Sequence, residues 1–442
     1  MKPEESTRFC HTLCHIGTAS ESIMQSRQFA LLLSPLLFAS STAAAAELMK
    51  DEAGNSFSVD GYIEPGIRIV DDPCSFSASN VADVDVAADL GDCTTTHTPD
   101  GFFLPRARLQ VSRSVGPNQK FSIELEALSA VSLVEAKAEF KLPAGADLTV
   151  GRFKVPFSGQ DLQSDSKIAF IDKADLAGAG PKRQFGANLG WNATEIGSLP
   201  AQWLRLDAGI YNGEATDSAT NLPATANADS DFLTAARLTL APQGFTRGLG
   251  ESDLRAADKR GTLEWQLGIA AATETRGRDN GDYDEQRAAA DLTARWNGYS
   301  LYAEGFQLER NFPGGEDSPF DYTGAGWLVQ ATAIVAETGD GQAVELAARF
   351  ESYDPKSEAD KANNRFFIPG SVGTGPFNSR GEQARDNLVV GATWYIRKHD
   401  LKLQANYTTR TETERWAGSE LSSDIARDVD NNVAGLQLTW RY

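Results

Sequence analysis

The chain has 442 residues, and its 41 Lys plus Arg against 61 Asp plus Glu give a formal net charge of −20 at pH 7. This acidic balance argues against nucleic-acid binding through a broad basic surface. No run of about eighteen apolar residues occurs, so the sequence offers no helical membrane span. The length fits two or three ordinary domains or one large β-barrel, whose membrane-crossing strands give only weak alternating signals.

The first predicted element is an export signal over residues 24–46. It begins at Met24, carries Arg27 ahead of an apolar stretch at 29–39, and ends in small residues that offer an Ala-x-Ala cleavage near Ala46. Pro35 and the nearby polar flanks disfavour the alternative, a buried helix. Residues 1–23 lack the pattern of a signal, and we interpret them as an upstream extension that a start at Met24 would leave out. The exported chain is then 47–442.

Cysteine placement gives one candidate disulfide. Cys10 and Cys14 belong to residues 1–23, where their spacing is a weak metal motif. Cys74 and Cys93 remain in the exported chain, and an oxidising compartment favours a disulfide between them over two free thiols. Both lie in residues 71–100, which hold seven Asp and no Lys or Arg. A solvated loop is the favoured interpretation of this segment, and an external vestibule that repels anions or binds divalent cations is the alternative.

Beyond residue 47 the hydrophobic pattern alternates with a period of two, which is typical of β-strands. In residues 204–210, apolar side chains alternate with Arg205 and Asp207. Residues 61–70, 105–112 and 344–351 alternate in the same way. One face of each segment is apolar and the other carries charges. A soluble β-sandwich alternates too, so the period alone does not identify the solvent of each face.

Connection lengths separate two ends of the predicted barrel. Asn297-Gly298 predicts a type I′ turn, and the connections at 338–342 and 398–400 are almost as tight. Long polar connections occupy 71–100, 213–230 and 354–383. Short turns at one end and long loops at the other are typical of a membrane β-barrel. Residues 241–261 depart from this scheme, because they form a long connection where a short turn is expected.

About sixteen strands are predicted, an even number that places both termini at the short-turn end. They begin near Phe57, Gly101, Gln119, Val131, Ala146, Arg183, Ala201, Asp231, Thr262, Gln286, Tyr299, Gly324, Gly341, Ala384, Leu401 and Asn431.

The last strand shows which solvent the apolar face meets. In GLQLTWRY, Leu436, Leu438, Trp440 and Tyr442 share one face. We expect the leucines to face acyl chains and the aromatic rings to lie in an interfacial girdle. Other girdle candidates near short turns are Trp296, Tyr299, Trp394 and Tyr407. The alternative is an ordinary aromatic core.

Several motifs resemble those of the phosphate-selective porin family. VGRFKVPFSGQDLQSD at 150–165 resembles its Gly-x-Phe-Lys-Pro-Pro-Phe-Ser signature, with Val155 in place of the first proline. The matching residues are Gly151, Phe153, Lys154, Pro156, Phe157 and Ser158. PRARLQVS at 105–112, the hairpin at 389–407 and the terminal strand extend the resemblance over about 57–442.

This resemblance implies a sixteen-stranded trimeric porin of the bacterial outer membrane, whose third external loop folds into the channel. That loop would run from about Lys154 to Lys182. A barrel this wide is not filled by its own side chains, so selectivity requires an inserted constriction. The basic groups expected along its ion path are Arg152, Lys154, Lys167, Lys173, Lys182 and Arg183, beside the acidic Asp161, Asp165, Asp172 and Asp175.

Phosphate specificity in the family depends on dense basic groups and an arginine ladder along the wall. The inward arginines predicted here are Arg68, Arg106, Arg108, Arg205, Arg237, Arg295, Arg349 and Arg397. Carboxylates such as Glu64, Glu124, Asp207 and Glu351 share the same face, and we expect them to form ion pairs with many of the arginines. The resemblance therefore leaves open whether phosphate or a broader range of solutes passes.

A passive pore without a cofactor or metal is the function that the sequence favours. Its expected partners are outer-membrane lipid, lipopolysaccharide and small solutes or ions. An enzyme would need a positioned base, yet the histidines, which are His11, His15, His97 and His399, form no Ser/His/acid arrangement. A Gly-x-Ser-x-Gly elbow is absent too. The remaining alternative is a secreted β-protein that binds carbohydrate or surfaces.

Overall fold

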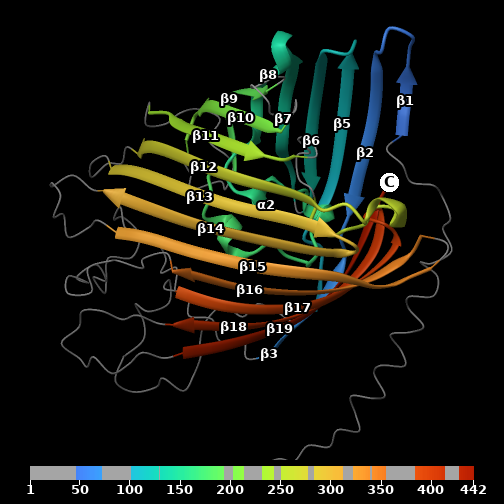
Figure 1. Ribbon diagram of the computed structural model, residues 1–442, viewed down its shortest axis with the longest axis vertical. Helices are drawn as coiled ribbons and strands as arrows, with labels where there is room; N and C mark the ends of the chain where they lie inside the picture. The colour runs from blue at the N-terminus through green and yellow to red at the C-terminus, as the bar shows by residue number, and fades with distance from the viewer. Residues whose placement is uncertain are drawn as a thin grey trace, which may run out of the picture. The chain divides into compact units, whose positions relative to one another are not determined.

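The computed structural model describes residues 46–71, 101–128, 130–193, 203–213, 231–242, 250–276, 283–311, 322–338, 341–354, 384–413 and 428–442. The predicted extension 1–23, the export signal 24–46 apart from Ala46, and the Cys74 and Cys93 pair lie outside the described residues. Within the described residues the strands form a single sheet of antiparallel neighbours (Figure 1).

The first part of the sheet contains β1 (Ala46–Lys50), β2 (Ser56–Ile63), β3 (Gly66–Asp71), β4 (Gly101–Phe103), β5 (Ala107–Val115), β6 (Gln119–Ala127), β7 (Val131–Lys141), β8 (Ala146–Lys154), β9 (Arg183–Asn192) and β10 (Leu204–Tyr211). The rest contains β11 (Leu233–Leu240), β12 (Glu264–Arg276), β13 (Tyr283–Trp296), β14 (Tyr299–Asn311), β15 (Tyr322–Glu337), β16 (Ala343–Asp354), β17 (Ala384–Arg397), β18 (Leu401–Thr413) and β19 (Asp428–Arg441).

The sheet closes into a barrel because its last strand pairs with its first. β19 pairs with β3 from Asn432 opposite Asp71 to Gln437 opposite Gly66, and β2 pairs in turn with β5. β2 and β3 together form one barrel strand, which is interrupted at Glu64 and Pro65, where the proline has no N–H to give to a ladder. β4 and β5 form the second barrel strand, and β6 to β19 supply the other fourteen. The predicted antiparallel barrel of sixteen strands is confirmed.

Strand positions follow the sequence pattern closely. The largest differences from prediction are three residues, as between the expected start at Ala201 and the observed start of β10 at Leu204. The short strand β1 was not predicted; it pairs with β2, at the short-turn end. Asn297 and Gly298 have φ values of 52° and 84°, as a type I′ turn requires.

The alternating pattern places apolar side chains outside the barrel and charged ones inside. On β10, Ile210 is 47% exposed whereas Asp207 is 2% exposed. Trp296, Tyr299 and Trp394 are exposed beside short turns, as expected of an interfacial girdle. Tyr407 is exposed as well, but it lies in the middle of β18, so its predicted place near a turn was wrong.

The helical elements of the described residues are short. They are α2 (Gly159–Leu162) and the 3₁₀ turns η3 (Pro143–Gly145), η4 (Asp165–Lys167), η5 (Asp175–Gly178) and η6 (Ala257–Lys259). No helix in the described part of the chain is long and apolar enough to cross a membrane. Three of these elements, α2, η4 and η5, lie in the long connection between β8 and β9.

Val390 tests the assignment of the outer face to lipid. It is exposed at the centre of β17, where a charged side chain would meet acyl chains. Val390→Arg should lower the free energy of unfolding in liposomes by about 2–4 kcal/mol. The control is Leu142→Arg in the exposed turn between β7 and β8, with an expected cost of about 0–1 kcal/mol. Equal costs at both positions would contradict the assignment.

Candidate functional site

The connection between β8 and β9, residues 155–182, hydrogen-bonds with interior-facing side chains of distant strands. Lys402 Nζ of β18 donates to the Ile168 carbonyl at 2.7 Å. Gln404 Nε2, two residues further on, donates to the carbonyls of Ile168 and Ala169 at 3.2 and 2.9 Å. On β16, Arg349 NH1 donates to the Asp172 carbonyl at 3.1 Å. Charged and polar wall groups thus satisfy backbone carbonyls of this irregular segment.

Apolar side chains also anchor residues 155–182. Phe157, Ile168, Phe170 and Leu176 are each 1% exposed. Phe157 packs edge to face on Phe306 of β14, with ring centroids 6.1 Å apart. The segment therefore has a small core of its own against the wall, which fixes its position in addition to the hydrogen bonds.

Two residues of the signature motif, Gly151 and Ser158, have roles that the structure explains. Gly151 has φ of 123°, and a Cβ there would lie 2.1 Å from the Ala136 carbonyl oxygen, so only glycine fits. Ser158 is the N-cap of α2, and its hydroxyl oxygen accepts a hydrogen bond from the Asp161 N–H at 3.1 Å. These residues shape the end of β8 and the turn into residues 155–182.

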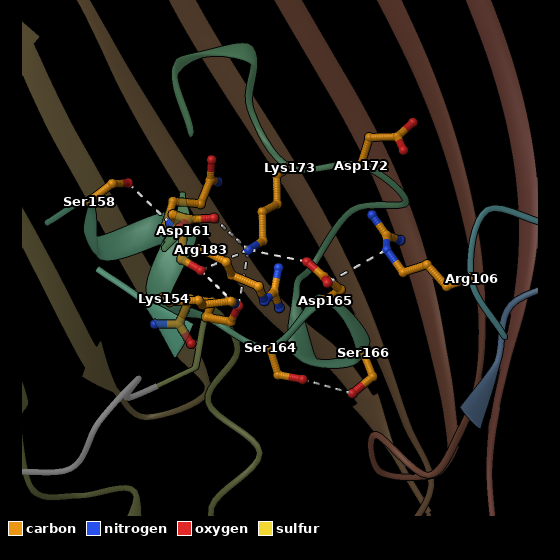
Figure 2. A network of polar contacts seen from close by, with 12 residues as sticks. Arg106, Lys154, Ser158, Asp161, Ser164, Asp165, Ser166, Asp172, Lys173 and Arg183 are labelled. Carbon is orange, nitrogen blue, oxygen red and sulfur yellow. Dashed lines mark hydrogen bonds and ion pairs between the residues drawn. The ribbon is translucent and has the colours of Figure 1, made fainter. Parts of the chain in front are cut away.

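Three basic side chains converge on the Asp165 carboxylate, and Figure 2 shows two of them, Arg106 and Lys173. Arg108 NH1 lies 2.6 Å from it, Lys173 Nζ 3.1 Å and Arg106 Nε 3.7 Å. Burial by itself would raise the pKa of Asp165, but the nearby charges of Lys173, Lys154 and the two arginines outweigh burial and hold this pKa well below its ordinary value. Asp165 is therefore an anion supplied by the chain itself.

Lys154 and Lys173 bind the same two backbone carbonyls. Lys154 Nζ donates to the carbonyls of Asp161 and Gln163 at 2.6 Å each, and Lys173 Nζ donates to them at 2.9 and 3.1 Å (Figure 2). The sequence placed both lysines along an ion path. Their ammonium groups clamp the turn after α2, which reduces what they can offer to a passing anion.

The other predicted basic groups of this region lie in varied surroundings. Arg183 Nε donates to Glu135 Oε1 at 2.9 Å, and Arg152 NH1 donates to the Leu133 carbonyl. Lys167, at the end of η4, is exposed, and so is Lys182.

The predicted arginine ladder is largely paired with carboxylates. The pairs are Arg68 with Asp172, Arg106 with Glu64, Arg108 with Glu124 and Glu126, Arg205 with Asp147 and Asp207, Arg237 with Asp291, Arg295 with Glu264, and Arg349 with Glu351. Arg397 lies at the end of β17. The expected ion pairing is confirmed for these seven arginines, so the ladder is not a row of unpaired cations.

The described interior contains a cavity beside residues 155–182 and, elsewhere, fully buried wall side chains. A cavity of about 210 Å³ lies between residues 155–182 and the wall of β5 to β9, and ten residues line it. They are Arg108, Glu124, Glu135, Lys137, Phe153, Lys154, Leu162, Ser164, Asp165 and Arg183. Across the interior, Gln330, Glu345 and Tyr395 on β15 to β17 are at most 1% exposed. One space beside the segment therefore lies along β5 to β9.

Comparison with known proteins places this architecture in a family. A family model described as phosphate-selective porin O and P matches residues 80–442. The chain belongs to the phosphate-selective porin O and P family. It is an outer-membrane porin, a channel and not an enzyme. The resemblance noted in the sequence is confirmed.

Solved structures of outer-membrane channels share the fold of this porin. The channel DcaP of Acinetobacter baumannii is 13% identical with a TM-score of 0.52, over 89% of this chain and 99% of that chain. OmpT of Vibrio cholerae is 10% identical with a TM-score of 0.50, over 90% and 100%. OprB of Pseudomonas putida is 10% identical with a TM-score of 0.50, over 88% and 95%. No curated protein matches the chain.

Lys402 and Gln404 are site residues that the sequence did not single out. Alternation places them on the inner face of β18, but it gives no signal for what an inward side chain meets. Their contacts with Ile168 and Ala169 become visible only once residues 155–182 are placed.

Gln404→Leu tests the anchoring of residues 155–182. The change removes two donors without altering charge, while Lys402 and Thr393 still donate to the carbonyls of Ile168 and Ala169. Local opening of residues 168–170 should become easier by roughly 1 kcal/mol, seen as faster amide hydrogen exchange. Gln437→Leu is the matched control, because Gln437 lies opposite Gln404 on β19 and no described contact joins it to this segment. Equal exchange in both variants would argue against the anchor.

Proposed function

We propose that this porin passes small hydrophilic solutes and ions by diffusion, with residues 155–182 folded into the lumen as the constriction. The path would lie between this segment and the wall of β5 to β9, where the cavity is found. Support comes from the hydrogen bonds that join the segment to interior-facing side chains of β16 and β18. A sixteen-stranded barrel leaves an aqueous lumen, so a narrowing element is needed for any selectivity.

The charge balance along this path supports a weak preference for anions. The cavity is lined by four basic groups, Arg108, Lys137, Lys154 and Arg183, and by three acidic groups, Glu124, Glu135 and Asp165. Most of them are partners in ion pairs. Paired charges produce a weaker field on a passing ion than unpaired ones of the same number.

The single observation that carries this proposal is the place of Asp165. Its carboxylate occupies the point where Arg106, Arg108 and Lys173 converge, which is where an oxyanion from solution would gain most. A tight phosphate site is therefore disfavoured while Asp165 is ionised. The second candidate function, a phosphate-selective path as the family description implies, is favoured by the number of inward arginines.

A measurement of reversal potential separates the general porin from the phosphate-selective path. The purified porin is placed in a planar bilayer under a steep KCl gradient, and phosphate is then added. Weak selectivity without phosphate block supports the general porin. Strong anion selectivity with block by phosphate supports the oxyanion path. Absence of any conductance from heat-modifiable, folded protein would contradict both.

Asp165→Asn should increase anion selectivity and introduce block by phosphate. Neutralising the carboxylate leaves Arg106, Arg108 and Lys173 without their shared anion, and an added oxyanion can replace it. Because the pKa of Asp165 is held well below its usual value, the wild-type carboxylate stays ionised from about pH 5 to 7, and the anion selectivity of the two proteins should differ throughout that range.

Asp172→Asn is the matched control for this variant. It makes the same charge change in the same segment, but the Asp172 side chain is 55% exposed and its pair with Arg68 is screened by solvent. A shift in reversal potential as large as that of Asp165→Asn would show that overall charge, and not the convergence on Asp165, determines selectivity.

We further propose that the porin assembles as a homotrimer among lipid and lipopolysaccharide. The family resemblance implies the trimer. The barrel wall also has one side of short strands on which neighbouring subunits could pack, since β5 to β11 have 8–11 residues and β12 to β19 have 12–16. Exposed Leu109, Phe121 and Ile123 lie on that side. Light scattering after extraction in mild detergent should give three times the mass of one chain; a monomer mass would reject this proposal.

Export by the signal at 24–46, with the Cys74 and Cys93 disulfide formed afterwards, is also a proposal. Mass spectrometry of the mature porin should find an N-terminus near Glu47 and a peptide that joins the two cysteines. An N-terminus upstream of Met24 would argue against the assigned signal.

A further inference from the structure

The connection between β11 and β12 is the long joint that the sequence pattern left unexplained at the short-turn end. Its stretch from 250 to 263 holds Glu251, Ser252 and Asp253, which are at most 2% exposed. Asp253 Oδ2 accepts a hydrogen bond from the Gly298 N–H in the tight turn between β13 and β14 at 3.0 Å. Ser252 Oγ donates to Glu345 Oε1 of β16 at 3.0 Å. The connection is therefore bound to the inner face of the barrel.

Glu251 joins this connection to residues 155–182, which start from the opposite end of the barrel. Its Oε2 accepts from the Ala169 N–H at 2.9 Å, and its Oε1 accepts from Gln160 Nε2 at 3.3 Å. Gln330 Nε2 of β15 donates to Oε2 at 2.9 Å. One carboxylate thus contacts the segment at two points nine residues apart and the wall at a third.

The three donors around Glu251 require a side chain at this position that accepts hydrogen bonds and has no N–H or O–H group of its own. The Ala169 group is a backbone N–H and cannot reverse its role. Gln160 cannot turn its amide around without loss, because its Oε1 accepts from the Ala174 N–H at 2.9 Å. An ionised carboxylate, which only accepts, satisfies all three donors, whereas an amide at position 251 would set an N–H group against one of them.

We propose that residues 250–263 act as a strut and that Glu251 is the positioning residue that holds the constriction segment against the β13 to β17 side of the barrel. The strut keeps that side closed, so that solutes pass along β5 to β9. This inference rests on the proposed role of residues 155–182 as the constriction.

The first test is the single-channel conductance of Glu251→Ala and Glu251→Gln. Without the strut contact, residues 155–182 move from the wall, and we expect about twofold higher conductance with more current noise, since conductance follows the open cross-section. Asp258→Asn is the matched control, because Asp258 is an exposed carboxylate of the same connection. Its conductance should equal that of the wild type.

The second test locates the opened space by thiol labelling, in a background where Cys74 and Cys93 are replaced by Ser. A cysteine in place of Thr293, which is 2% exposed on β13, should be protected from a charged methanethiosulfonate reagent in the otherwise unchanged porin. It should become reactive when Glu251→Ala is added. A cysteine in place of Lys137, which lines the cavity beside β7, should react in both backgrounds.

Two results would overturn the strut. One is wild-type conductance and noise in heat-modifiable, folded Glu251→Gln; the other is protection of the Thr293 position when Glu251→Ala is present. If Asp165→Asn still alters ion selectivity in that case, the constriction proposal stands and only the strut fails. If Asp165→Asn also leaves selectivity unchanged, both proposals fail. If Glu251→Ala does not fold, the conductance of Glu251→Gln decides the first test, and Glu251→Gln takes the place of Glu251→Ala in the labelling test.

Discussion

Closure of the sheet is the constraint on which the rest of this porin depends. A strand that crosses a lipid bilayer must find partners for all its backbone N–H and C=O groups, and only a closed ring of strands does this without an open edge. Sixteen strands provide closure here, but a ring of this width has a lumen that wall side chains cannot fill. The buried charges follow from that width, and so does the constriction that we propose for residues 155–182.

Electrostatics inside the barrel follows from the same geometry. Charges that point into a partly filled lumen lose water, so each needs a partner of opposite sign, and the structure supplies one for nearly every inward arginine described. Asp165 is the clearest example, because one carboxylate serves three basic groups. A porin can therefore carry the arginine pattern of an oxyanion channel and have much of that pattern neutralised from within.

The sequence was sufficient to predict the wall, because a period of two reports directly on which face each residue takes. Leu206 and Arg205 alternate in the sequence and lie on opposite faces of β10. It predicted inward arginines and their pairing for the same reason. It could not predict which carbonyl Lys402 would bind, or that the ammonium group of Lys154 would bind two backbone carbonyls, since both depend on where an irregular segment lies. Residues 250–263 have no periodicity, so their length was the one signal they gave.

The seam between β19 and β3 has a consequence for biogenesis. It pairs Leu436 with Ile67, residues near opposite ends of the described chain. Where the first barrel strand is interrupted, the Leu438 N–H donates a hydrogen bond to the Pro65 carbonyl. Contacts this remote in sequence form slowly, because the whole intervening chain must be ordered first. The barrel cannot complete its ring until β19, at the end of the chain, lies beside β3. Until then the edge of β3 is unpaired, which leaves the incomplete barrel open to wrong pairing with other strands.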